Sequence, residues 1–225
     1  MTAPRIKFEY CALRYLNMWL ETEKAQHEAL AGPDGPDGVD EAKKLAALSK
    51  FATGYRIARN LRTAFDVDKD VARLKPVLDI LGKFCPEDFD GELLQGAIRT
   101  VENQIRSAYG DRGVLSATTK FLWLKFRTPI IIYDRQARIA LKTKTEDLAG
   151  FYAKWREGFE KNRPLIDAAC DSLPSVSKFT MWTTDEIAEV ASQQWFRERV
   201  FDIYLWQIGS AIGELSSGAD EPSEV

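Results

Sequence analysis

Hydrophobic residues recur every three to four positions along most of this chain, which is the spacing of amphipathic helices. Runs of alternating hydrophobic and polar residues, the mark of half-buried strands, are nearly absent. The pattern predicts helices over residues 4–30, 39–65, 74–81, 86–109, 135–141, 143–163 and 183–208, and a further apolar helix that carries Lys120 in the stretch that begins at Ser116. We therefore predict an all-α, compact multi-helix fold.

Polar and conformationally flexible residues set the expected boundaries of this fold. The segment GPDGPDG makes residues 32–38 an exposed loop, because proline and glycine cannot continue a helix there. The polar, acidic residues 216–225 are expected to form a disordered tail. Between its start and this tail, over residues 1–215, the chain is predicted to be a single helical domain.

Three further local signals concern the C-terminal half of the chain. Thr143 with Glu146, and Thr183 with Glu186, have the spacing of capping boxes that begin helices. Pro164 should break or restart the first of these helices. The second is the longest and most aromatic helix and is hydrophobic on all sides, so Trp206 is expected in the core, where its replacement by alanine costs about 3–5 kcal/mol.

The stretch from Ser116 to Leu141 has the most informative pattern. A hydrophobic helix carrying Lys120 leads through Pro129 to the apolar run Ile130–Ile132, which is expected to be extended. Asp134 follows as the predicted N-cap of the helix RQARIAL, residues 135–141. The run and its cap fix a carboxylate at a helix N-terminus.

Lys120 and Asp134 each have a functional and a structural interpretation. If its helix is packed on most sides, Lys120 is partly desolvated, which lowers a lysine pKa toward use as a nucleophile in Schiff-base chemistry. The alternative is an ordinary lysine that extends from an amphipathic helix to solvent. Asp134 either stabilises developing positive charge at the edge of a cleft or only caps its helix, which is worth about 1 kcal/mol.

Composition and charge exclude several classes of protein. The 225 residues carry a net charge of −3, with a pI near 5.4, which gives no whole-chain argument for nucleic-acid binding. His27 is the only histidine and is expected at the surface, and the three cysteines lack metal-site spacing, so neither a metal nor a cofactor is expected. The separated cysteines and the absence of a leader or membrane-spanning run predict a cytoplasmic protein that does not enter membranes.

Charge is distributed unevenly along the chain. Residues 120–144 contain seven basic side chains against the single acid Asp134, a local charge of +6. This asymmetry indicates either a phosphate-contacting surface for DNA or a surface that binds an acidic protein partner. The residues predicted to contact nucleic acid are Lys125, Arg127, Arg135, Arg138 and Lys142.

From Gly110 to Leu141 the order of glycine-containing turn, lysine-bearing helix, apolar run and aspartate resembles the helix-hairpin-helix DNA glycosylases, especially 8-oxoguanine DNA glycosylases. Gly113 and Val114 match the start of the hairpin turn, although Leu115 stands where the family has a second glycine and Lys120 comes about one helical turn late. The resemblance implies two helical lobes flanking a cleft and a flipped-out substrate base. It also implies that Lys120 attacks the sugar and that Asp134 stabilises the cationic transition state, which would make the protein a DNA glycosylase and lyase for DNA repair. The alternative is a helical interaction protein with no catalytic role.

Overall fold

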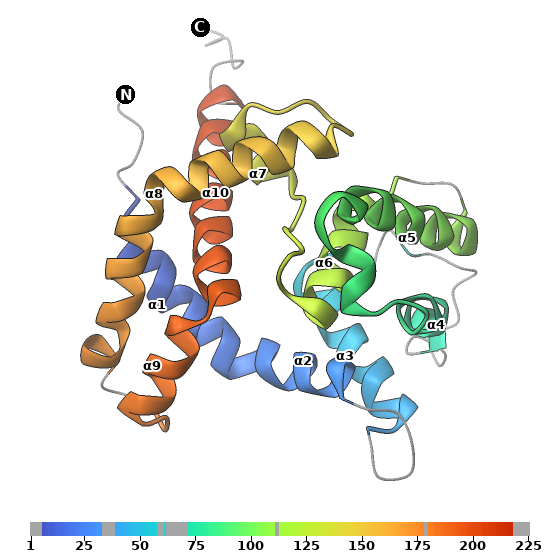
Figure 1. The fold of residues 1–225 in the computed structure, drawn as a ribbon, viewed down its shortest axis with the longest axis horizontal. Coiled ribbons are helices and arrows are strands. Elements are labelled where there is room, and N and C mark those ends of the chain that lie inside the picture. Colours follow the sequence, from blue (N-terminus) through green and yellow to red (C-terminus); the bar gives the residue numbers. More distant parts are fainter. Residues whose placement is uncertain are drawn as a thin grey trace, which may run out of the picture. The chain divides into compact units, whose positions relative to one another are not determined.

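The computed structural model describes residues 6–32, 39–57, 61, 72–110, 113–177 and 180–217, with side chains up to residue 214 (Figure 1). Every regular element of these residues is helical, which confirms the all-α fold class. The α-helices are α1 (Phe8–Met18), α2 (Lys24–Ala31), α3 (Glu41–Gly54), α4 (Lys75–Leu81), α5 (Leu94–Tyr109), α6 (Leu115–Phe126), α7 (Arg135–Leu141), α8 (Leu148–Val176), α9 (Thr184–Ser192) and α10 (Gln194–Ser217). None of these helices is long and apolar enough to span a bilayer.

Shorter helical turns connect these helices. A π-helical turn, Trp19–Glu23, follows α1 directly and leads into α2. Single 3-10 turns at Ala72–Leu74, Pro86–Phe89 and Gly91–Leu93 precede α4 and α5. The predicted loop at 32–38 and the predicted tail at 216–225 fall almost wholly outside the described residues.

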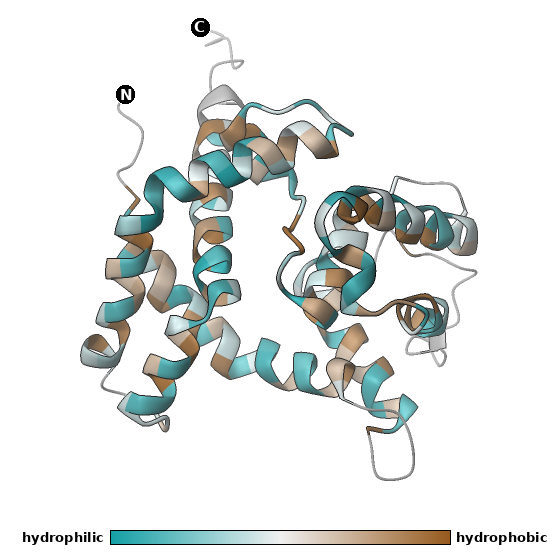
Figure 2. Cartoon of the chain, viewed as in Figure 1, coloured by the Kyte–Doolittle hydropathy of each residue, from teal (hydrophilic) through white to brown (hydrophobic). Residues whose placement is uncertain are grey.

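Within the span expected to form one domain, the chain divides into two compact units. Unit 1 consists of Met1–Met18 and Tyr133–Val225, and unit 2 is the continuous segment Trp19–Ile132. Unit 1 thus joins the first helix of the chain to its last four helices. The second boundary between the units follows the buried run Ile130–Ile132. This run is non-helical, as predicted, but it forms no strand, and its hydrophobic residues are drawn in brown in Figure 2.

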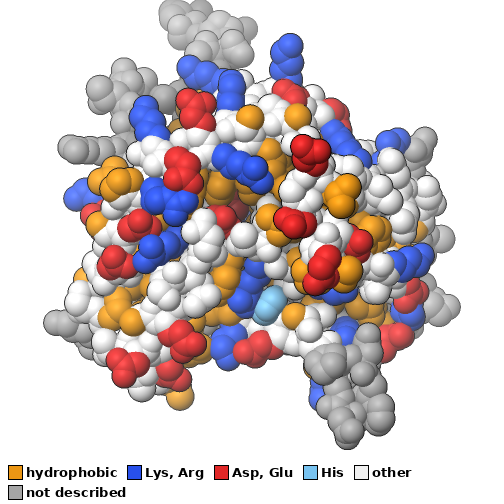
Figure 3. Space-filling model, viewed as in Figure 1, with side chains coloured by type: hydrophobic (Ala, Val, Ile, Leu, Met, Phe, Trp, Pro, Cys, Tyr) orange, Lys and Arg blue, Asp and Glu red, His pale blue; other side chains and the backbone are white. Residues whose placement is uncertain are grey.

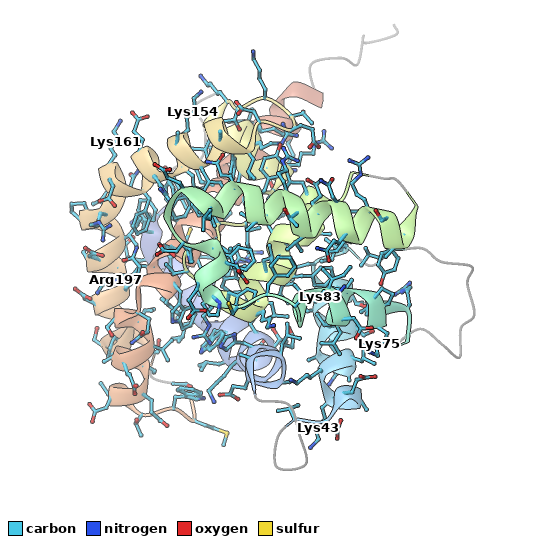
Figure 4. All side chains as sticks on the ribbon, turned by 45° about the vertical axis from the view of Figure 1, so that its right-hand side comes forward. Lys43, Lys75, Lys83, Lys154, Lys161 and Arg197 are labelled. Atoms are coloured by element: carbon cyan, nitrogen blue, oxygen red, sulfur yellow. The ribbon has the colours of Figure 1, made fainter. Side chains whose placement is uncertain are left out.

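Unit 1 is built around α10, which packs against α1, α7, α8 and α9. Its core is aromatic: the rings of Trp155 and Phe159 stack at 5.2 Å, and Phe201 meets the Trp155 ring edge-on at 5.2 Å. Arg197, labelled in Figure 4, ties α10 to α8 through ion pairs of 2.9 Å to Asp167 and to Asp171. Stacked rings and ion pairs therefore fix α8 on α10.

Unit 2 is built around α6, which packs against α2 and α5. In α6, Leu115 and every residue from Ala117 to Leu124 are buried, including Lys120. This helix is therefore covered on most sides, as its hydrophobic sequence indicates. Helix α5, which precedes α6, ends at Gly110, whose φ of 81° is left-handed as expected of a glycine that ends a helix. The turn that would hold the hairpin motif includes residues 111 and 112, which are outside the described part of the chain.

Helix caps and prolines separate the correct local predictions from the wrong ones. The capping box of Thr183 and Glu186 is confirmed, whereas the one at Thr143 and Glu146 is wrong. Asp147 caps α8 instead, because its carboxylate accepts a 2.8 Å hydrogen bond from the Gly150 N–H. The predicted break at Pro164 is also wrong, since α8 continues through it, with buried side chains on both sides of the proline.

Trp206 is the main error concerning the core. Its side chain is 43 % exposed, and the Arg14 guanidinium lies 5.5 Å from the centre of its ring. The neighbours of Trp206 in α10, Leu205 and Ile203, are buried. An aromatic residue that faces solvent cannot contribute the core stabilisation expected from the sequence.

Candidate functional site

Asp134 is fixed at the N-terminus of α7, as predicted. Its carboxylate accepts a 2.8 Å hydrogen bond from the Gln136 N–H, and its extended backbone directs the chain into the helix. Helix α7 in turn lies against α10, where Gly209 touches the backbone of Gln136. Side-chain capping and close helix packing therefore hold this carboxylate in one place.

A second carboxylate, Asp202 of α10, is buried in the same unit as Asp134. Burial raises the pKa of Asp202 from 3.8 to about 7; the Arg199 guanidinium and the Trp155 hydrogen bond oppose this rise, while the Glu198 and Asp134 charges add to it. The Trp155 indole N–H donates to Asp202 at 2.7 Å, and Arg199 lies 3.7 Å from its other oxygen. A carboxyl group with this pKa can give or take a proton near neutral pH.

Lys120 belongs to unit 2 and is buried, with 6 % of its side chain exposed. Its ammonium group donates to the Ser116 hydroxyl at 2.9 Å and lies 5.9 Å from the centre of the Tyr55 ring. The Tyr55 hydroxyl donates in turn to a carboxylate oxygen of the buried Glu23. Lys120 and Asp134, predicted as one catalytic pair, are therefore in different units, each with neighbours of its own.

The five residues predicted to contact nucleic acid are divided between the units and differ in accessibility. In unit 2, Lys125 donates to the carbonyl oxygens of Leu81 (2.7 Å) and Phe84 (3.4 Å), and the Arg127 guanidinium covers the Trp19 ring at 4.5 Å. Both side chains are half-buried. Their contacts within the protein account for them without a ligand.

In unit 1 the predicted cations are more accessible. Arg135 and Lys142 are exposed, as is Lys144, whereas Arg138 donates to the Thr145 hydroxyl at 3.1 Å. Lys154 of α8, labelled in Figure 4, donates to the carbonyl oxygens of Leu141 and Lys142 at the end of α7. Basic and acidic side chains are interspersed over the face of the molecule drawn in Figure 3. Accessible cations thus follow Asp134 along the sequence.

Metal binding finds no support in the described part of the chain, where no group of three or more His, Cys, Asp or Glu side chains could hold an ion. Cys11 and Cys170 are buried, and their thiol pKa values are raised to about 12, mainly by burial. A thiol with so high a pKa is a poor ligand and a poor nucleophile.

His27 is not the surface histidine that the sequence suggested. It is half-buried in α2, and its Nδ1 lies 2.7 Å from the carbonyl oxygen of Leu124 in α6. Burial and the Arg127 charge lower the pKa of His27 from 6.5 to about 4, although the Leu124 hydrogen bond and Glu28 oppose this shift. The histidine therefore joins α2 to α6 in its neutral form.

The depressed pKa of His27 gives a pH dependence with a definite sign. Because the unfolded chain binds this proton at a higher pH than the folded chain, the contribution of His27 to stability is complete above pH 6.5 and is lost as pH falls toward 4. We expect a loss of about 1–2 kcal/mol by pH 5. The only histidine in the chain gives one imidazole signal, so an NMR titration measures its pKa directly. A midpoint at 6.5 in folded protein would contradict this environment.

Three residues close to Asp134 or Lys120 in the fold, Asp202, Glu23 and Tyr55, could not be chosen from the sequence pattern alone. Asp202 left a weak signal, as the single charged residue in the apolar run Val200–Trp206. Glu23 and Tyr55 left none, because the first lies among polar residues and the second has the spacing of a core aromatic. Contacts between elements distant in sequence bring Tyr55 to Lys120 and Glu23 to Tyr55.

Comparison of this chain with protein families, with curated proteins and with solved structures gave no significant match. The resemblance to the helix-hairpin-helix DNA glycosylases therefore depends on the residues between Gly110 and Leu141.

Proposed function

We propose that this protein binds DNA and acts in base excision as a DNA glycosylase of the helix-hairpin-helix kind. The observation that carries the proposal is the placement of Asp134, a carboxylate fixed by its own helix and followed by the exposed cations Arg135, Lys142 and Lys144. The division of the chain into two helical units agrees with the two lobes that the resemblance implies.

The chemistry assigned to Asp134 is electrostatic. When the bond between the base and the sugar breaks, the base leaves with the bonding electrons and positive charge develops on the sugar ring. A carboxylate already held in position stabilises this charge without a cost of reorganisation during the reaction. The hydrogen bond from Gln136 holds Asp134 in this way.

Lys120 is assigned the covalent step. Its nitrogen attacks the sugar carbon C1′ as the base leaves with the bonding electrons, and the nitrogen loses a proton. The C1′–O4′ bond then breaks, O4′ takes up a proton as a hydroxyl group, and the imine that forms is reduced by borohydride to a stable amine. Within unit 2 the amine must first leave the Ser116 hydroxyl, to which it donates a hydrogen bond. Breaking this hydrogen bond is therefore part of the covalent step.

Base release and borohydride trapping on a panel of duplexes with damaged bases test the two assignments separately. We expect Asp134→Asn to slow base release about 100-fold, because the substitution keeps the capping geometry and removes the charge. Asp147→Asn is the matched control, since Asp147 caps α8 with a hydrogen bond of the same length. Equal rates in both variants would remove Asp134 from the mechanism.

Trapping is measured on the same duplexes and on one with an abasic site. We expect wild-type protein to form a covalent adduct and Lys120→Ala to form none. An adduct that persists in Lys120→Ala would transfer the covalent step to another amine. Base release without any adduct would leave a glycosylase that does not use Lys120.

A second candidate function, a helical interaction protein with an acidic protein partner, is favoured by the contacts of Lys125 and Arg127. Both cations are satisfied by groups of their own unit, as structural side chains would be. Duplex binding as a function of salt distinguishes the candidates, because each phosphate contact contributes about one unit to the slope of log affinity against log salt. Absence of binding at low salt would favour the interaction protein.

A further inference from the structure

Three side chains of unit 2 form a chain of contacts that ends at Lys120. Glu23 closes the π-helical turn, Tyr55 follows the last residue of α3, and Lys120 lies in the middle of α6. The Tyr55 hydroxyl donates to Glu23, and the Lys120 ammonium lies 5.9 Å from the centre of the Tyr55 ring. The phenol thus bridges a buried carboxylate and a buried ammonium group.

The packing of α2 on α6 places this chain of contacts. His27 of α2 meets the carbonyl group of Leu124 at 2.7 Å. Glu23 precedes His27 by four residues and Lys120 precedes Leu124 by four, so both lie about one helical turn back along the same two faces. Tyr55 then connects these two residues, through its hydroxyl to Glu23 and through its ring to Lys120.

Glu23 is costly as a purely structural residue. Its side chain is 1 % exposed, and among the described residues its Oε2 has no hydrogen-bond partner. Burial of a carboxylate oxygen without a partner destabilises a fold, and such groups in native proteins call for an explanation. The π-helical turn that carries Glu23 is itself a feature often found at functional sites.

We propose that Tyr55 and Glu23 are positioning residues for the Lys120 amine. The carboxylate of Glu23 fixes the phenol, and its hydrogen bond increases the electron density of the ring that faces the ammonium group. Ser116 holds the same amine from its own helix. The use of the amine on DNA rests on the proposed function, whereas its positioning does not.

The test measures the reactivity of Lys120 by reductive methylation of the folded, full-length chain with formaldehyde and cyanoborohydride, followed by peptide mass spectrometry. Lys44 is the internal control, because it is also in unit 2, is 5 % exposed, and donates to the Gly32 carbonyl oxygen at 2.9 Å. Both lysines are expected to react slowly in the wild-type protein. General loosening of unit 2 would accelerate both together.

Tyr55→Leu removes the ring and is expected to accelerate methylation of Lys120 about tenfold, while methylation of Lys44 stays unchanged. A tenfold change in rate corresponds to about 1.4 kcal/mol, which is within the range of a desolvated cation–π contact. Tyr55→Phe and Glu23→Gln keep the ring but weaken its anchor, so each should accelerate Lys120 about threefold. These two variants serve as the test if Tyr55→Leu does not fold.

The same variants are expected to lower the yield of the borohydride-trapped DNA adduct, the opposite direction from methylation. Wild-type protein that forms no adduct would refute the proposed covalent step, while the methylation rates would still decide the positioning role. Unchanged methylation of Lys120 in all three variants, or equal acceleration of Lys44, would overturn the inference.

Discussion

Gly209→Ala is expected to lower the free energy of unfolding by at least about 3 kcal/mol, because no side chain fits between α10 and α7 at this position. A Cβ atom on Gly209 would lie 1.9 Å from the carbonyl oxygen of Gln136 and 2.5 Å from its carbonyl carbon. Both atoms belong to the backbone, which cannot rotate away as a side chain can. Helix α7 would have to move, together with the Asp134 that caps it.

Gly213→Ala, in the same helix, is the matched control, since a Cβ there meets nothing within 4 Å. Alanine is a better helix former than glycine, so this variant should equal the wild-type protein or exceed its stability by up to about 1 kcal/mol. Urea unfolding followed by circular dichroism measures both. Similar stability of the two variants would show that α7 adjusts to the methyl group at little cost.

Gly209→Ala also bears on the proposed function, because it disturbs Asp134 without removing it. If the carboxylate stabilises charge on the sugar, base release should slow in those molecules that remain folded, because a small displacement of a catalytic group lowers the reaction rate strongly. Base release at the wild-type rate in folded Gly209→Ala would indicate that the position of Asp134 is unimportant.

Phe196→Ala is expected to cost about 3–5 kcal/mol, the range for removing a fully buried aromatic side chain. The Phe196 ring has no exposed surface and lies 4.8 Å from the Tyr15 ring of α1 and 5.8 Å from the Trp195 ring. Its loss leaves a cavity where α1 and α10 meet. The expected result is a lower midpoint of urea unfolding with little change in helix content at zero urea.

Trp206→Ala provides the contrast on the same helix. Because this ring is 43 % exposed and contacts the Arg14 guanidinium, its removal should cost about 1 kcal/mol or less. The hydrophobic pattern alone predicted the larger value for Trp206. A loss above 3 kcal/mol would place Trp206 in the core after all.

The sequence determined the elements whose signals are local. Helix α7 was predicted with its observed bounds, and Asp134 with its capping role, because an N-cap needs only its own side chain and the next few N–H groups. The capping box of Thr183 and Glu186 was readable for the same reason. The sequence left Lys120 open between burial and extension to solvent, and the structure shows that it is buried.

Local signals failed where tertiary packing outweighed them. Pro164 has an unfavourable helix propensity, but α8 continues through it with Phe159 and Ile166 buried on either side. Asp147, rather than Thr143, begins this helix, because Gly150 leaves room for the Asp147 carboxylate at its N-terminus. Packing of the helix decided the first case, whereas a competing local cap, Asp147 with Gly150, decided the second.

Only the tertiary structure decided which residues surround the candidate site residues. Tyr55 contacts Lys120 from the end of α3, Glu23 holds the Tyr55 hydroxyl from the π-helical turn, and the Asp134 charge makes a minor contribution to the environment of Asp202 in α10. The boundary between the two units falls after Ile132, so a stretch that is continuous in sequence places Lys120 and Asp134 in different units. Periodicity shows that a helix has a hydrophobic face, but the partner of that face depends on chain segments far away in the sequence.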